Sequence, residues 1–344
     1  MSSAPNDKHV TRENHFLPQW YLRHWSLDDL NVYAYRTLVS SNKVKEWEQR
    51  SIRKTAYLRD LYTTFADGKE VDEFERWITT EFEEPACEPV ERVIHNEKLS
   101  STDWDKLAVF MAAQDLRTPA SLVESIQRWE RTLPEMVDSV TKKALSEYEQ
   151  AKRRGTELVL PLLKPNPLAE HFKIQLQRND DGISIGTEVV LGRGLWLAQM
   201  KHLLTGAANK LKGHKWAIAV PKGRTEWFTS DHPVTKLNFN TLDDYNFKGG
   251  WGRKGTDLFL PISPRHLLFT EVGKDSPDWV RFSWEKTDLI QRMLAEHAHH
   301  WLFARKPIPE ASKLRPRIVD PERFRAESEA AASWHENQRR LESE

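Results

Sequence analysis

The chain has 344 residues, of which 30% are charged and 39% hydrophobic, a composition typical of a globular protein with a buried core. Lys and Arg together number 51, and so do Asp and Glu, so the formal net charge is zero. Bulk charge therefore provides no general attraction to nucleic acid or to anionic membranes. The single cysteine, Cys87, excludes an internal disulfide framework and a multi-cysteine zinc site.

The N-terminal residues 1–14 are polar and are expected to form a flexible tail. They contain no apolar segment that would serve as a signal peptide. No stretch of the sequence approaches the roughly 18 apolar residues that a membrane span requires. We therefore expect a cytoplasmic protein that does not contact membranes.

The first half of the chain is predicted to be rich in helices. Pro18 suits the first turn of a short helix, and residues 31–36 alternate as a strand does. A helical pattern begins near residue 69, and Pro85 and Pro89 are expected to break or kink it.

Two more helices follow in this half. Thr102 and Asp105 have the spacing of an N-cap pair at the start of the first. The second is long, covers residues 120–154, and is expected to be kinked or divided at Pro134.

The second half mixes helix and strand after a proline-rich linker at residues 158–167. The sequence Asn179-Asp-Asp-Gly182, between two alternating runs, predicts a β-hairpin. Further along, helices are predicted at residues 195–211 and 285–304, strands at 216–220, 226–229 and 266–270, and a surface helix at 326–341.

We therefore predict an α+β fold, with a helix-rich N-terminal half packed on a mixed α/β C-terminal half that contains a small antiparallel sheet. Residues 15–304 are expected to form a single domain, with a helical lobe at about 15–155 and a mixed lobe at about 168–304. Residues 305–344 are expected to form a charged C-terminal tail.

The sequence Ser230-Asp231-His232-Pro233 follows a strand-like run and predicts a sharp turn. The proline moves His232 away from helical backbone angles. Asp231 can then bond to the local backbone or direct its carboxylate above the sheet edge.

Five short motifs, in order, resemble the bacterial and phage family known as domain of unknown function 4238. They are His15-x-x-Pro18-x-x-Tyr21-Leu22-Arg23-x-Trp25-Ser26, the acidic helix with Glu75 and Glu81, Arg117-Thr118-Pro119, Ser230-Asp231-His232-Pro233-Val234, and Pro261-Ile262-Ser263-Pro264. The sequence departs from the family pattern at His232, where the family usually has Asn, and at Trp25, where it usually has Phe. The resemblance implies no established activity.

Polar residues of these motifs are the candidates for one composite catalytic site, namely His15, Glu81, Arg117 and Asp231. Histidine exchanges protons near neutral pH, a carboxylate can orient it, and a guanidinium can clamp a phosphate. The structural alternative is that Arg117 pairs with Glu81, Asp231 closes its own turn, and His15 caps the N-terminal segment.

Candidate binding residues come from the same motifs and from one loop. Tyr21, Arg23 and Ser230 belong to the motifs. Trp251, Arg253 and Lys254 lie in a glycine-rich basic loop that could grip single-stranded nucleic acid or could simply be mobile.

Other histidines leave several alternatives open. Arg292 and His297 have the spacing of a pair found in helical RNA-cleaving toxins. His297 and His300 share a helix face, and Asp231 with His232 could also supply metal ligands. The structural alternative for these histidines is an exposed or core position, so we assign no metal site and no cofactor.

Two hypotheses of function follow. The first is a hydrolase or nuclease that acts on a phosphate-containing substrate, RNA or a phosphorylated small molecule, in a toxin or phage-defence setting. The second is a non-catalytic ligand-sensing or interaction module in which tryptophan-rich helices bind a protein partner. The sequence does not decide between them.

Overall fold

The computed structural model describes residues 10–66, 69–155, 171–179 and 182–343, so the predicted linker at 158–167 lies outside the described residues. The helical elements are α1 (Gln19–Arg23), η1 (Ile52–Lys54), α2 (Glu73–Ile78), η2 (Thr79–Glu83), α3 (Glu84–Ile94), α4 (Ser101–Leu116), α5 (Pro119–Arg154), α6 (Arg193–His202), η4 (Leu203–Ala207), α7 (Asn209–Lys212), α8 (Trp284–His297), α9 (Ala311–Leu314) and α10 (Pro321–Ser343). The strands are β1 (Glu13–His15), β2 (Asn31–Arg36), β3 (Leu38–Val39), β4 (Trp47–Ser51), β5 (Tyr57–Arg59), β6 (Thr64–Ala66), β7 (Lys69–Val71), β8 (Phe172–Asn179), β9 (Gly182–Val189), β10 (Ala217–Val220), β11 (Thr229–Ser230), β12 (Thr235–Thr241), β13 (Asp244–Asn246), β14 (Asp257–Ser263), β15 (His266–Glu271), β16 (Trp279–Arg281), β17 (Trp301–Ala304) and β18 (Ile318–Val319).

The predicted α+β class is confirmed, with helices concentrated in the first half. The largest sheet has six strands in the order β13-β12-β14-β15-β10-β16. Its pairs are antiparallel except β10 with β16, which run parallel. All seven residues of β14 are buried, as expected for a strand covered on both faces.

A second sheet joins strands from distant parts of the chain in the order β11-β17-β2-β4. Strand β2, at the predicted residues 31–36, pairs along its length with β4 and β17. Ser230 pairs with Leu302 in the same sheet. The turn that follows Ser230 is therefore held against the C-terminal part of the chain.

The helical layer is nearly continuous from Glu73 to Ile94, where α2, η2 and α3 follow one another without a break. The chain stays helical through Pro85 and Pro89, so the first of the two expected effects, a break, does not occur. Pro85 is the second residue of α3. Pro89 lies inside the helix. The intervening η2 is a π-helix, which changes the phase of the side chains that follow.

Two predicted helix boundaries need correction. Helix α4 is capped by Ser100 and Asp103, which form a complete capping box, and not by Thr102 and Asp105. Helix α8 ends at His297, and Trp301–Ala304 forms strand β17 rather than the end of a helix. A short run of apolar residues such as β17 is compatible with either a strand or the end of a helix, so the local sequence pattern does not distinguish the two.

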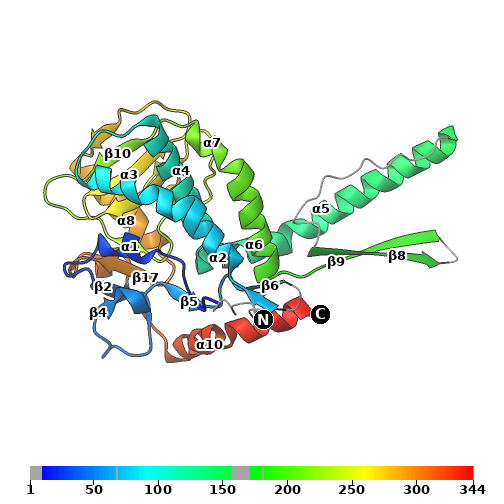
Figure 1. Cartoon of the computed structure of the whole chain (residues 1–344), viewed down its shortest axis with the longest axis horizontal. Coiled ribbons are helices and arrows are strands. Elements are labelled where there is room, and N and C mark those ends of the chain that lie inside the picture. The colour runs from blue at the N-terminus through cyan, green and yellow to red at the C-terminus, as the bar shows by residue number, and fades with distance from the viewer. Residues whose placement is uncertain (1–9, 67–68, 156–170, 180–181, 344) are drawn as a thin grey trace, which may run out of the picture.

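Helix α5 and the hairpin β8–β9 extend away from the main body of the protein, as Figure 1 shows. The helix runs unbroken through Pro134, so the predicted division there is wrong. It ends at Gly155, whose φ of 65° is the left-handed conformation typical of helix C-termini. The predicted hairpin is confirmed, because Asn179 pairs with Gly182.

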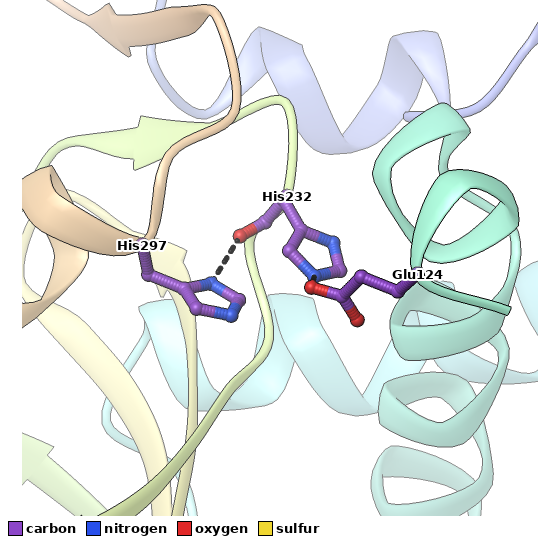
Figure 2. Close-up of side chains that lie close together, drawn as sticks. All are labelled: Glu124, His232 and His297. Atoms are coloured by element: carbon purple, nitrogen blue, oxygen red, sulfur yellow. Dashed lines mark hydrogen bonds and ion pairs between the residues drawn. The ribbon is translucent and has the colours of Figure 1, made fainter. Parts of the chain in front are cut away.

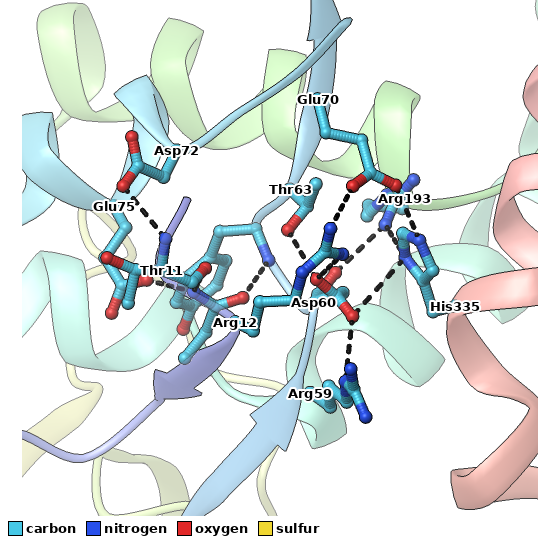
Figure 3. Close-up of polar contacts among 12 residues, drawn as sticks. Thr11, Arg12, Arg59, Asp60, Thr63, Glu70, Asp72, Glu75, Arg193 and His335 are labelled. Atoms are coloured by element: carbon cyan, nitrogen blue, oxygen red, sulfur yellow. Dashed lines mark hydrogen bonds and ion pairs between the residues drawn. The ribbon is translucent and has the colours of Figure 1, made fainter. Parts of the chain in front are cut away.

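The C-terminal helix α10 covers the predicted residues 326–341 and lies along one edge of the molecule (Figure 1). Fully buried Arg193 binds it: the guanidinium pairs with Glu342, and its backbone N–H donates to Gln338. Figure 3 shows His335 of α10 beside Glu70 and Asp60, at 3.0 Å and 3.9 Å.

The N-terminal segment is attached to the same polar cluster. Arg12 forms ion pairs with Asp60 and Glu70, and Glu13 and Asn14 lie in β1, paired with β5. Residues 10–14 are therefore part of the folded structure rather than of a flexible tail. Within the described part of the chain, no helix combines the length and the apolar character needed to cross a membrane.

Candidate functional site

Arg117, one of the predicted catalytic residues, is almost fully buried and has all its described contacts within the fold. Its guanidinium pairs with Glu83, donates from Nε to the Tyr62 hydroxyl at 3.3 Å, and donates from Nη2 to the His15 carbonyl at 2.5 Å. Burial opposes the charge of Arg117, but Glu83 and Tyr62 outweigh it and raise the pKa of the guanidinium. The contacts are those of a structural cation.

Glu81, the predicted partner of Arg117, is exposed, and Glu83 is buried in its place. Both residues belong to the π-helix η2, in which one turn takes more residues than an α-helical turn. The sequence motif therefore does not distinguish these two glutamates, which lie two residues apart in the same helical segment. This expected pairing is corrected to Arg117 with Glu83.

His15 contributes its backbone rather than its ring to this cluster. The imidazole Nε2 lies 3.2 Å from the Arg53 carbonyl, and the ring lies 5.6 Å from that of Tyr57. Burial lowers the pKa of His15. Its neighbour Asn14 donates to Glu75, whose pKa burial raises to about 7.

Asp231 stabilises a loop. Its two carboxylate oxygens accept hydrogen bonds from the backbone N–H groups of His299 and His300, at 2.9 Å and 2.8 Å. Ser230 accepts from the N–H of His232 at 3.2 Å, so both polar residues of the turn are used to hold backbone. Arg117 and Asp231 thus direct their charged groups to different partners.

The two candidates from the opening motif are placed differently. Tyr21 is fully buried; its hydroxyl donates to the Pro261 carbonyl at 2.6 Å and lies 2.7 Å from the Thr229 hydroxyl. It therefore joins α1 to β14 and β11. Arg23 is exposed on α1.

The Arg117-Thr118-Pro119 turn and the Ser230–Pro233 turn meet at one hydrogen bond. Thr118 Oγ1 lies 2.8 Å from His232 Nδ1. His232 is 3% exposed, and its other ring nitrogen, Nε2, is buried with no hydrogen-bond partner among the described residues. A buried polar atom without a partner calls for an explanation, such as a bound ion or water.

Two further side chains lie around that nitrogen. Glu124 Oε1, from α5, is 3.7 Å from His232 Nε2. His297, the last residue of α8, stacks on His232 with ring centroids 4.4 Å apart and planes inclined by 20°. Figure 2 shows the three residues arriving from separate elements. One donor atom from each lies within 4.8 Å of the other two.

The protonation of the two histidines suits metal coordination. Nδ1 of His297 lies 3.1 Å from the His232 carbonyl, which can only accept, so Nδ1 carries the proton and Nε2 has the free lone pair. Burial, and then the charge of Lys236, lower the pKa of His297 to about 4. Burial, with His297 and Lys236, lowers the pKa of His232 well below its usual value. Both rings are neutral at pH 7, the form that binds a metal ion.

The geometry of the cluster must change before an ion is held. A tetrahedral ion with bonds of about 2.1 Å keeps its ligand atoms roughly 3.4 Å apart. The Glu124 side chain is 58% exposed and has room to move, whereas Thr118 fixes the His232 ring. Because an ion lies in the plane of each imidazole it binds, one of the stacked rings must turn. Two imidazoles and one carboxylate are a donor set that fits zinc and other first-row divalent ions.

Charged residues border this cluster. Lys236, four residues after His232, pairs with buried Asp115, whose second oxygen accepts from the Trp251 indole N–H at 2.8 Å. Arg292, the proposed partner of His297 in a ribonuclease-type pair, instead donates to Glu296 at 2.7 Å. Arg253 and Lys254 are exposed in the loop beyond Trp251.

The sequence did not reveal the three-residue cluster. Local sequence indicates His232 and His297 as possible ligands, whereas Glu124 is far from both in the sequence and belongs to a charged helix face typical of solvated surface.

The fold and these contacts define an α+β protein with a candidate His₂–Glu metal centre. The chain belongs to the family described as protein of unknown function (DUF4238), whose model matches residues 13–307. No curated protein and no solved structure matches the chain.

Proposed function

We propose that this protein is a metal-dependent hydrolase of phosphate esters, with Glu124, His232 and His297 as the metal ligands. The observation that carries the proposal is the buried Nε2 of His232, which has no hydrogen-bond partner in the described part of the chain and lies beside a carboxylate and a second neutral imidazole. A bound divalent ion would lower the pKa of a water molecule and stabilise negative charge on a substrate oxygen. Three protein ligands leave coordination positions open for both.

Hydrolysis is favoured over other chemistry of this donor set because it needs water alone as the co-reactant. Two histidines and a carboxylate also hold iron in oxygenases, which require an oxidant and a reductant. In hydrolysis, the oxygen of one water bonds to phosphorus as the ester bond breaks. One hydrogen of the water remains on the acid product or is lost as a proton, and the other completes the leaving alcohol.

A phosphate ester is favoured by charge. Two neutral imidazoles and one carboxylate leave a divalent ion with one net positive charge, and the nearby charge of Lys236 is offset by its ion pair with Asp115. Such a site attracts anionic substrates. The direction toward RNA and the toxin or phage-defence setting are part of the proposal and rest on the sequence resemblance alone.

The roles proposed for the residues change accordingly. Arg117 and Asp231 remain predictions as catalytic residues, and their contacts favour a structural role. This observation supports the second candidate function, a metal-binding or ligand-sensing module without catalysis. The two candidates share the metal site and differ in turnover.

The test combines metal binding with hydrolysis. We expect Zn²⁺ or Mn²⁺ to bind the full-length protein in titration calorimetry with one site, and the loaded protein to hydrolyse bis(p-nitrophenyl) phosphate. Glu124→Gln and His297→Gln should weaken metal binding at least about tenfold and abolish hydrolysis. Glu130→Gln, an exposed carboxylate on the same helix, is the matched control.

Each outcome decides something. Metal binding without hydrolysis of any phosphate ester would favour the ligand-sensing module. Equal metal affinity in wild type, Glu124→Gln and His297→Gln would refute the site itself. Since Glu124 is exposed, its variant should unfold with a free energy within about 0.5 kcal/mol of wild type, so lost binding cannot be ascribed to unfolding.

A further inference from the structure

The segment between β12 and β14 carries an alternation of aromatic and basic side chains. We call residues 245–254 the basic-aromatic segment. Its aromatic residues are Tyr245, Phe247 and Trp251, and its basic residues are Lys248, Arg253 and Lys254. Because the formal net charge of the whole chain is zero, this local concentration of cations distinguishes the segment from the average surface.

The segment touches the candidate metal centre near its beginning. The Phe247 ring lies 4.9 Å from the His297 ring, centroid to centroid. Tyr245, two residues earlier, is 6.0 Å from Phe247 and donates its hydroxyl proton to Glu296 at 2.5 Å. The segment therefore contacts one of the proposed metal ligands, His297, directly.

The middle of the segment is held by contacts with Asp115 and Lys236, the charged residues that border the same centre. The Trp251 indole donates to Asp115, which pairs with Lys236. Gly249 donates to the Lys236 carbonyl at 3.1 Å, and a Cβ at this glycine would lie 2.8 Å from that oxygen. Only glycine permits this approach, which holds the segment against β12.

The cations of the segment are available to a ligand. Lys248, Arg253 and Lys254 are exposed, as is Lys210 of α7, whose side chain lies against Gly252. None of the four forms an ion pair with another residue in the described ranges. The Trp251 ring is half-buried with its nitrogen fixed, so part of its surface is presented in a constant orientation.

We infer that the basic-aromatic segment, together with Lys210, binds single-stranded nucleic acid and leads its backbone to the Glu124–His232–His297 centre. Exposed cations neutralise successive phosphates, and aromatic faces stack on bases that are not paired. The inference rests on the proposed function for the fate of the bound strand, and names the substrate class. Binding itself does not depend on the metal.

The test measures binding separately from cleavage. We would follow the fluorescence anisotropy of a labelled single-stranded RNA of about 12 nucleotides, and of the same sequence as DNA, with full-length protein in EDTA. Arg253→Glu combined with Lys254→Glu should weaken binding at least about tenfold and reduce the dependence on salt. Lys43→Glu combined with Lys45→Glu, both exposed in another loop, makes the same change in net charge and should leave the affinity within about twofold.

Several results would overturn the inference. They are no binding of either oligonucleotide by the wild type, equal weakening by the two double variants, or binding of phosphatidylserine vesicles through Arg253 and Lys254 with no binding of oligonucleotide. Lys210→Glu is a second variant on a different element and should also weaken binding.

The design separates this inference from the proposed function. Glu124→Gln should retain the oligonucleotide affinity and lose hydrolysis. A second outcome is that the wild type hydrolyses a small phosphodiester, while the wild type and the Arg253→Glu, Lys254→Glu double variant bind and cleave oligonucleotides equally. The inference then fails and the hydrolase stands. If oligonucleotides bind as expected and neither they nor bis(p-nitrophenyl) phosphate are hydrolysed with metal present, the hydrolase fails and the binding surface stands.

Discussion

Thr118 and His232 are 114 residues apart in the sequence, and their side chains form a hydrogen bond of 2.8 Å. The same threonine is the N-cap of α5, where Oγ1 accepts from the N–H of Ser121 at 3.2 Å. The helix that carries Glu124 therefore begins at the residue that orients His232. One hydroxyl group positions both halves of the candidate metal centre.

Thr118→Val should accordingly affect stability and metal binding together. Loss of the N-cap is expected to lower the free energy of unfolding by about 1–2 kcal/mol. Loss of the bond to a metal-ligating imidazole is expected to weaken metal affinity by about 10- to 100-fold. Chemical denaturation and calorimetry measure the two effects, and Thr118→Ser, which keeps the hydroxyl, should restore both. Full affinity in the valine variant would mean that His232 is oriented by its packing alone.

Arg117→Met should destabilise the fold strongly. The substitution leaves the buried carboxylate of Glu83 without its partner, which is expected to cost about 3–5 kcal/mol. In the double variant with Glu83→Gln, both charges of the Arg117–Glu83 pair are removed. Much of the lost stability should therefore be recovered. Urea denaturation of the two single variants and the double variant measures this coupling. Independent, additive losses would show that the pair is not coupled, and an inactive but fully stable Arg117→Met would return the residue to a catalytic role.

Secondary-structure elements that depend on local residue patterns could be predicted from the sequence. The alternation at residues 31–36 and the turn residues at Asn179–Gly182 were sufficient for β2 and for the hairpin β8–β9. The Arg-Thr-Pro and Ser-Asp-His-Pro motifs also indicated the right neighbourhood, since Thr118 and His232 meet.

Other features depend on information that no local pattern contains. Glu83 pairs with Arg117, whereas Glu81 of the same segment Thr79–Glu83 is exposed, and only tertiary packing distinguishes the two. Glu124 is exposed and belongs to a charged helix face, and only the packing of α5 against the turn after β11 identifies it as a neighbour of His232. The metal donors are brought together by tertiary contacts between residues 124, 232 and 297.

Asp231→Asn should destabilise the loop that precedes β17. The carboxylate accepts two backbone N–H bonds, and a charged acceptor is worth about 1.5–3 kcal/mol in such contacts. The asparagine amide retains only one acceptor oxygen. We expect a loss of about 2 kcal/mol in the free energy of unfolding, measured by denaturation. Asp288→Asn, at an exposed position of α8, is the control and should change it by less than about 0.5 kcal/mol.

Glu75 should make the stability depend on pH in a defined window. Burial raises its pKa to about 7, from a usual value of 4.5, so the folded state favours the protonated form. The unfolded chain releases that proton first, and stability is therefore lost as pH rises from about 4.5 to about 7 and is constant above it.

Glu75→Gln removes this dependence and retains the size and hydrogen-bonding capacity of the protonated acid. Relative to wild type, the variant should gain about 2.5 kcal/mol of stability between pH 5 and pH 8. Denaturation at the two pH values gives the difference directly, with Glu73→Gln, at an exposed position two residues earlier, as the control. If the wild type and Glu75→Gln lose or gain stability in parallel across this range, Glu75 titrates alike in the folded and unfolded states, and its contact with Asn14 holds a charged carboxylate.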